Sequence, residues 1–349
     1  QEGGDTEPSP VQVPFLDEWM SSGHADATAE AFIHWDEESP AEVPESCAKC
    51  HSSTGYQDFL GADGTEAGVV NAPHPVGTVV DCVACHNDVT VTKTSVVMPS
   101  GLEITGLGDE SRCMECHQGR QSKVSVDQAI ADAGVDADTV SDQLSFLNIH
   151  YYAAAATKYG TLAKGGYEYD GNSYDANFAH VEGYDTCNGC HNPHTLELKL
   201  EECATCHASD DLAIESAEDL KNVRMEGSGL DYDGDEDTDE GIYFEIEGLQ
   251  EALLANIQAY ASEVAGTAIG YYPAAHPYWF IDANADGEIT EDEAISDGRF
   301  VTWTPRLLQA AYNYQVSKKD PGNYAHGGKY TIQLLYDSIA SLNEAVATP

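Results

Sequence analysis

The sequence predicts a mainly α-helical protein with extensive irregular loops and a small β-hairpin. Three observations lead to this fold class. The motif Cys-x-x-Cys-His occurs five times between residues 47 and 207, and loops rich in glycine and proline separate several of its copies. The chain has no cysteine after residue 207, and three segments there carry apolar residues at helical spacing. Residues 89–105 alternate apolar and polar residues around Pro99 and Gly101. We therefore expect a cysteine-containing domain at 1–207 and a helical module at 208–349.

The repeated motif predicts covalently attached haem. Two thiols three positions apart can bond the two vinyl groups on one edge of a haem, and the histidine that follows can bind the iron. Cys-x-x-Cys pairs also form zinc sites, redox dithiols or disulfides, but none of these requires the adjacent histidine. All ten cysteines belong to the motifs. We predict five haem c groups held by Cys47, Cys50, Cys82, Cys85, Cys113, Cys116, Cys187, Cys190, Cys203 and Cys206, with proximal iron ligands His51, His86, His117, His191 and His207.

Eight histidines lie outside the motifs, so a second axial ligand is available for every iron. His194 is too close in sequence to His191 to bind the same iron, and we expect it to reach the haem of the fifth motif or of an earlier one. His74, between two prolines, is a weaker candidate. The predicted distal ligands are His24, His34, His150, His180, His194 and His326.

Local patterns predict the elements around these residues. His24 and His34 lie about three turns apart in a predicted helix at 21–38, and His150 lies in another at 142–158 beside a run of alanines. We expect an extended arm at 1–20 that packs on a neighbouring copy, and irregular loops at 55–81 and 160–186. The remaining predictions are a hairpin at 89–105, a serine-capped helix at 125–134, and an antiparallel bundle of helices at 248–266, 302–319 and 328–346.

Two acidic stretches predict calcium binding. One matches an EF-hand loop, with oxygen ligands at positions 1, 3 and 5, glycine at 6, a backbone carbonyl at 7 and glutamate at 12. The other alternates carboxylates but lacks the glycine and the final glutamate, so it is the weaker prediction. The alternative for both is a solvated acidic loop. The predicted ligands are Asp282, Asn284, Asp286, Glu288 and Glu293 in the first loop, and Asp231, Asp233, Asp235 and Asp237 in the second.

The formal net charge of −46 excludes nucleic acid as a partner, because a duplex would be repelled and no basic patch exists. It also argues against binding to an anionic membrane. No apolar run reaches the roughly 18 residues of a membrane span. Haem attachment of this type occurs outside the cytoplasm, so we read Gln1 as a mature terminus and expect an extracellular or cell-surface protein, with the periplasm as the alternative.

The five motifs, together with AFIHW, NIHYYAAAA and CHNPHT, resemble those of multihaem c-type cytochromes used in respiratory and extracellular electron transfer. The C-terminal segment AYNYQVSKKDPGNYAHGGKY is similar to part of the nitrite reductase and hydroxylamine oxidoreductase-like group. That resemblance implies that His326 binds a haem of the preceding domain. The chain lacks the Cys-x-x-Cys-Lys site that nitrite reductases of this group often use.

Two functions are compatible with this pattern. The first is an electron carrier that is not an enzyme, in which histidines close both faces of every iron. Its partners would be other redox proteins or extracellular electron acceptors, and it could stack end to end into a conductive filament, like cytochrome nanowires. The second is a multihaem reductase of a small nitrogen or sulfur oxyanion with one open iron, although the negative surface would repel such a substrate.

Overall fold

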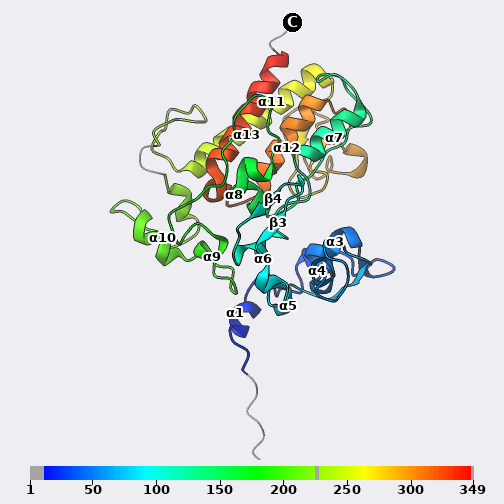
Figure 1. The fold of residues 1–349 in the computed structure, drawn as a ribbon. Helices are drawn as coiled ribbons and strands as arrows, with labels where there is room; N and C mark the ends of the chain where they lie inside the picture. Colours follow the sequence, from blue (N-terminus) through cyan, green and yellow to red (C-terminus); the bar gives the residue numbers. More distant parts are fainter. Residues whose placement is uncertain (1–11, 225–227, 347–349) are drawn as a thin grey trace, which may run out of the picture. The chain divides into compact units, whose positions relative to one another are not determined.

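The computed structural model describes residues 12–224 and 228–346, and it is mostly helical with loops and small antiparallel strand pairs (Figure 1). The predicted fold class is confirmed. The described residues divide into two compact units: unit 1 contains residues 12–93 and 186–199, and unit 2 contains residues 94–185, 200–224 and 228–346. The first, second and fourth motifs thus lie in unit 1, and the third and fifth lie in unit 2.

Unit 1 is built from short elements. Its helices are α1 (Leu16–Met20), α2 (Glu30–Ile33), α3 (Glu45–His51), α4 (Ser53–Leu60), α5 (Cys82–Cys85) and α9 (Cys187–Cys190), with a 3₁₀ turn η1 (Thr90–Thr92). One antiparallel pair joins β1 (Glu42–Val43) to β2 (His74–Pro75). It contains two small apolar clusters of buried side chains, one around Trp35 and Val43 and the other around Tyr56 and Leu60.

Unit 2 carries the main apolar core. Its helices are α6 (Glu110–Met114), α7 (Lys123–Ala133), α8 (Ala154–Ala163), α10 (Leu200–His207), α11 (Ile242–Tyr260), α12 (Pro305–Lys319) and α13 (Asn323–Val346). Two hairpins join β3 (Ser95–Val97) to β4 (Glu103–Thr105) and β5 (Ile269–Tyr271) to β6 (Trp279–Ile281). Shorter turns are η2 (Asp219–Asn222), the π-helical η3 (Ala261–Ala265) and η4 (Ser296–Gly298).

Helices α11, α12 and α13 pack against one another, as the sequence predicted (Figure 1). Their facing side chains, including Leu253, Leu308 and Leu335, are fully buried. Thr304 caps α12 by accepting a hydrogen bond from the Leu307 N–H, and Pro305 occupies the first turn, where its missing N–H costs nothing. Helix α8, from before the fourth motif, packs on α13. The predicted boundary at residue 207 therefore falls inside unit 2, and an independent module at 208–349 stays a prediction.

Several predicted elements are correct in kind and differ in extent. The hairpin predicted at 89–105 forms between residues 95 and 105, with Val96 opposite Ile104, and it is one of three two-stranded sheets among the described residues. The helix predicted at 125–134 begins earlier: its cap is Ser122, whose N–H donates a hydrogen bond to the Ser125 hydroxyl oxygen at 3.2 Å. Gly134 ends it in the left-handed conformation, as predicted. Part of the loop predicted at 55–81 is helical, because α4 extends to Leu60.

The helix predicted at 142–158 is wrong, since only residues from Ala154 onward are helical. Residues 148–153 instead wrap around the third motif: the Arg120 N–H donates to the Ile149 carbonyl at 2.8 Å, and the Ala155 N–H donates to the His117 carbonyl at 2.9 Å. His150 and Tyr152 have φ values of 84° and 52°, which no α-helix accommodates. Tertiary hydrogen bonds to the motif therefore replace the helical ones.

The helix predicted at 21–38 is also wrong for most of its length, because only Glu30–Ile33 is α-helical. The Asp26 carboxylate accepts hydrogen bonds from the Thr28 N–H at 3.0 Å and the Thr28 hydroxyl at 2.6 Å. Such local side-chain bonds favour a turn over a helix. The arm predicted at 1–20 lies outside the described residues up to residue 11, and α1 occupies its end.

Replacing Leu335 with alanine should lower the free energy of unfolding by about 2–5 kcal/mol, because its side chain is fully buried between α13 and its neighbours. Urea titration followed by circular dichroism measures the change. The matched control is Tyr336→Ala, whose side chain is 62% exposed on the same helix and whose loss should cost no more than about 0.5 kcal/mol. Equal losses for the two variants would contradict the packing described here.

Candidate haem and calcium sites

All five Cys-x-x-Cys-His motifs lie on or at the end of short helices: α3, α5, α6, α9 and α10. Residues three apart on a helical turn share one face, so the two thiols of each motif face the same side. None of the ten cysteines forms a disulfide, and all are partly or fully exposed. The motifs thus present ten accessible thiols, which is the arrangement that thioether attachment of haem requires.

Three proximal histidines are oriented by backbone carbonyls. Nδ1 lies 2.8 Å from the Ala31 carbonyl in His51, 3.1 Å from the Tyr152 carbonyl in His117, and 3.1 Å from the Leu196 carbonyl in His191. A carbonyl oxygen can only accept, so Nδ1 carries the proton in each ring. The other nitrogen, Nε2, is then the one with a lone pair for a metal.

The structure brings two predicted distal histidines beside proximal ones. In unit 1 the His86 and His194 rings are nearly parallel, at 9°, with centroids 6.2 Å apart. In unit 2 the His180 and His207 centroids are 5.8 Å apart. Two imidazoles bound to opposite sides of one metal through bonds of about 2 Å have centroids about 6 Å apart. Both pairs therefore have the spacing that an iron between the rings needs.

The surroundings of these pairs favour metal binding. The Phe15 ring stacks on His194 at a centroid distance of 4.6 Å and 7°, which fixes the plane of the imidazole. Burial, and then the neighbouring His180, lower the pKa of His207. A lowered pKa keeps the imidazole neutral, which is the form that binds a metal.

The other four predicted distal ligands lie in different settings. The His24 carbonyl accepts a hydrogen bond from the Val80 N–H, which ties its turn to the second motif. His34 is exposed, with Nδ1 2.7 Å from Glu30 Oε1. The His150 ring lies 5.0 Å from Tyr151 in the segment that wraps the third motif. His326, predicted in a loop at a helix start, lies in the first turn of α13, and its Nδ1 contacts the buried Asp320.

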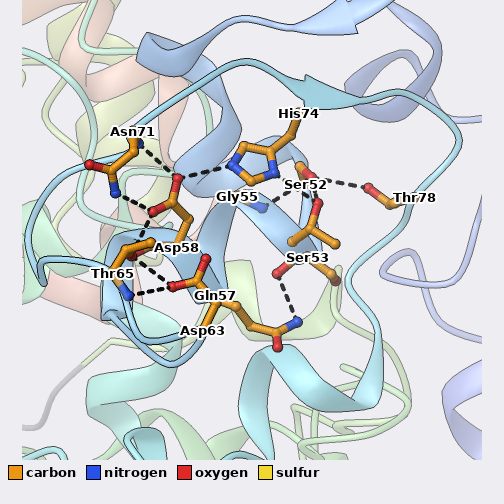
Figure 2. A network of polar contacts seen from close by, with 11 residues as sticks. Ser52, Ser53, Gly55, Gln57, Asp58, Asp63, Thr65, Asn71, His74 and Thr78 are labelled. Atoms are coloured by element: carbon orange, nitrogen blue, oxygen red, sulfur yellow. Dashed lines mark hydrogen bonds and ion pairs between the residues drawn. The ribbon is translucent and has the colours of Figure 1, made fainter.

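His74 belongs to a structural network instead (Figure 2). Its Nδ1 lies 3.1 Å from Thr54 Oγ1 and its Nε2 lies 3.2 Å from Asp58 Oδ2. The buried Asp58 carboxylate also accepts hydrogen bonds from the Asn71 backbone N–H at 2.7 Å and the Asn71 amide at 2.6 Å. These bonds from Asn71, with those from Thr65 and His74, hold the pKa of Asp58 well below its usual range. Both ring nitrogens of His74 are thus used to close the loop between α4 and β2.

The predicted EF-hand loop follows strand β6 rather than a helix, but its backbone is folded for a cation. Asp282 is buried, and its two carboxylate oxygens accept hydrogen bonds from the Ala285 N–H at 2.7 Å and the Gly287 N–H at 2.8 Å. Gly287 has a φ of 89°, as position 6 requires. Glu293 at position 12 folds back to accept from the Ala283 N–H at 3.1 Å. Position 8, Ile289, packs on Gly270 of the β5–β6 hairpin.

The second acidic loop has the same backbone pattern. The two oxygens of Asp231 accept hydrogen bonds from the N–H groups of Gly234 and Glu236, at 2.6 and 3.0 Å. Both donors have positive φ, as Ala285 and Gly287 do in the first loop. Glu236 thus adopts the conformation that glycine usually supplies at position 6. Asp237, also predicted as a ligand, accepts hydrogen bonds through Oδ1 from the Asp239 and Glu240 N–H groups.

Two glutamates that the sequence did not identify complete this second loop. Carboxylate oxygens of Asp231, Asp233 and Glu245 lie within 4.8 Å of one another, and so do those of Asp233, Asp235 and Glu240. Burial, followed by repulsion from the neighbouring carboxylates, raises the pKa of Glu240 to about 7. Glu245 is fully buried and accepts a hydrogen bond from the Arg224 guanidinium at 2.6 Å. Neither glutamate occupies an EF-hand position, so sequence spacing could not predict them.

Comparison with known proteins finds relatives of one kind. The chain is 28% identical over 400 residues to the C-type polyheme cytochrome OmcC of Geobacter sulfurreducens, a match that covers 95% of this chain and 47% of that protein. It is also 28% identical over 395 residues to the C-type polyheme cytochrome OmcB of the same species, and this match covers 92% of this chain and 47% of OmcB. The chain thus spans about half the length of these curated relatives. No family model and no solved structure matches it. Within residues 12–224 and 228–346, no helix is long and apolar enough to span a membrane.

Asp58→Asn should destabilise the protein at neutral pH, and the loss should shrink in acid. The folded-state pKa of Asp58 is depressed, so its stabilisation is complete above the unfolded pKa of about 4 and disappears as the pH falls below that value. Urea unfolding between pH 3 and 7 measures the difference between the variant and the parent. A difference that stays constant across this range would contradict the prediction. The exposed Asp63, in the same loop, provides the comparison variant Asp63→Asn, for which we expect a smaller loss.

Proposed function

We propose that this chain is a multihaem c-type cytochrome that carries electrons through five covalently attached haems. The observation that carries the proposal is the fivefold Cys-x-x-Cys-His motif on helical turns, with the Nδ1 atoms of three motif histidines held by carbonyls. The names of the polyheme cytochromes that match nearly the whole chain support the same conclusion.

The residues present fit the group. Each motif offers two thiols for thioether bonds and one imidazole for the iron, and none of the thiols is used in a disulfide. When bound, haem supplies a one-electron couple between its ferric and ferrous states. The chain attaches each haem, fixes the ring plane of its axial histidines and sets the electrostatic surroundings of the iron.

We assign His194 to the iron held by His86, and His180 to the iron held by His207, from the centroid distances of 6.2 and 5.8 Å. His24, His34, His150 and His326 remain the candidates for the other three irons. Two histidines on an iron leave no position for a substrate, so this ligand set favours an electron carrier over a reductase.

The partners we propose are other redox proteins or extracellular electron acceptors, at the cell surface or outside the cell. The high negative charge favours a partner that presents cations, because complementary charge accelerates encounter.

A second candidate role is assembly into a filament. Val13, Phe15, Leu16 and Met20 expose apolar surface near the N-terminus, which a neighbouring copy could cover. Filaments in electron micrographs of the haem-loaded protein would support this role, and monodisperse particles would contradict it.

We also propose two structural calcium sites, in the loops at 282–293 and 231–245. A bound dication would neutralise carboxylates that otherwise repel one another, and both loops already direct side-chain oxygens inward through backbone hydrogen bonds. In the second loop, burial and then repulsion from the neighbouring carboxylates raise the pKa of Glu240 to about 7.

Replacing His194 or His180 with alanine should convert one haem of the five from low spin to high spin and allow it to bind cyanide, because an axial position becomes open. Electronic absorption and electron paramagnetic resonance of the oxidised protein measure the change. The control is His74→Gln: both of its ring nitrogens contact protein oxygens, so every low-spin signal should persist. If His194→Ala and His180→Ala also retained wholly low-spin spectra, the ligand assignment would be wrong.

Calcium should raise the midpoint of thermal unfolding, and Asp282→Ala and Asp231→Ala should each remove one binding site in isothermal titration calorimetry. At pH 6 the second loop should release protons on binding, because Glu240, with a pKa of about 7, must ionise to bind the cation. Proton release is measured by repeating the titration in buffers of different ionisation enthalpy. Binding that survives both substitutions would show that the cation lies elsewhere.

A further inference from the structure

The carboxylate of Asp320 is a buried anion in contact with Nδ1 of His326, one of the predicted distal ligands. Asp320 follows α12 and is only 1% exposed. Its Oδ1 and Oδ2 both lie 2.9 Å from Nδ1 of His326, and its Oδ1 also accepts a hydrogen bond from the Gly322 N–H at 3.1 Å. A carboxylate accepts, so His326 donates from Nδ1, and Nε2 is the nitrogen with the lone pair for a metal.

This contact differs from those at the other candidate ligands. His51, His117 and His191 donate from Nδ1 to neutral backbone carbonyls. His34 contacts a carboxylate, but the Glu30 side chain is 78% exposed, whereas that of Asp320 is 2% exposed. Solvent screens the charge of Glu30, and the buried charge of Asp320 acts at nearly full strength on the imidazole.

The same turn of chain also orients the third motif. The Lys319 carbonyl, next to Asp320, accepts a hydrogen bond from the Tyr152 N–H at 2.8 Å, and the Tyr152 carbonyl accepts from His117 Nδ1. Gly322 allows the His326 ring to lie close to the backbone of this turn, because a Cβ at position 322 would lie 2.6 Å from His326 Cε1. The end of α12 therefore fixes both the proximal histidine of the third motif and the position of His326.

We propose that Asp320 is a positioning residue that lowers the reduction potential of the haem bound by His326. A buried anion at Nδ1 makes the imidazole a stronger donor through Nε2, and a stronger donor favours the ferric over the ferrous iron. The step concerned is the transfer of one electron to ferric iron, and no proton moves. The inference rests on the proposed function, because it takes His326 as an axial ligand.

The test is a spectroelectrochemical titration of the haem-loaded protein carrying Asp320→Asn, which keeps the size of the side chain and an acceptor oxygen but removes the charge. The ferric preference of one haem should fall about tenfold, which corresponds to a potential raised by about 59 mV for a one-electron couple. All haems should stay low spin, so loss of ligation would not explain the shift. The matched control is Glu30→Gln, whose exposed carboxylate should give a much smaller shift.

A second variant covers the case in which Asp320→Asn does not fold. Gly322→Ala forces His326 away from its present place beside the turn while leaving the charge of Asp320, and it should alter the electron paramagnetic resonance g values of one low-spin haem. Unchanged potentials in Asp320→Asn, or unchanged g values in Gly322→Ala, would overturn the inference. His326→Ala tests the underlying ligation separately: if it leaves every low-spin signal intact, then His326 is not a ligand and the proposed ligand set is what fails.

Discussion

The hydrogen bond from Nδ1 of a histidine to an acceptor elsewhere in the chain is the interaction on which this structure depends. It sets the tautomer, so that Nε2 is the nitrogen with a lone pair for a metal, and it restricts the orientation of the ring. In His51, His117 and His191 the acceptor is a backbone carbonyl of a segment distant in sequence or just beyond the motif. Irregular segments such as 148–153 are therefore structural supports of the motifs, although they form neither helix nor strand.

Charge is the second constraint. Each haem would add acidic propionates to a chain that already has a net charge of −46. Two arginines pair with carboxylates: Arg224 lies beside the buried Glu245, and Arg306 lies beside the exposed Asp138. The two acidic loops bring several carboxylates close together, and this is the reason we propose them as calcium sites. Asp320 differs, because its charge is buried beside a histidine, where it can act on a single metal centre.

Sequence patterns predicted the elements that depend on local chemistry. The C-terminal helices, the hairpin at 95–105 and the Gly134 cap follow from periodicity and from conformational preference, which neighbouring residues determine. The predicted helix at 142–158 failed because hydrogen bonds to the third motif, some 30 residues earlier, replace helical ones, and periodicity carries no information about them. The turn at Asp26 was in principle readable from its Asp-x-Thr sequence.

The sequence also predicted some residues of the candidate sites and missed others. The motif residues and the EF-hand loop could be recognised in the sequence because haem attachment and EF-hand coordination each require a fixed spacing. Sequence could list distal histidines but could not pair them, because His194 approaches His86 only through folding. His74 had an equally suggestive position between two prolines, and the structure assigns it to Asp58. Glu240, Glu245 and Asp320 lie near the predicted ligands in the chain, but they occupy no position of a motif and were not predicted.

We propose that histidines occupy both axial positions of five covalently attached haems. Near-infrared magnetic circular dichroism of the oxidised protein, combined with its intact mass and haem content, is the decisive measurement. We expect five haems for each chain and a charge-transfer band typical of two histidine ligands for all of them. Finding zinc or disulfides in place of haem would contradict this proposal. So would a charge-transfer band too weak for five haems, accompanied by a high-spin signal from the unmodified protein.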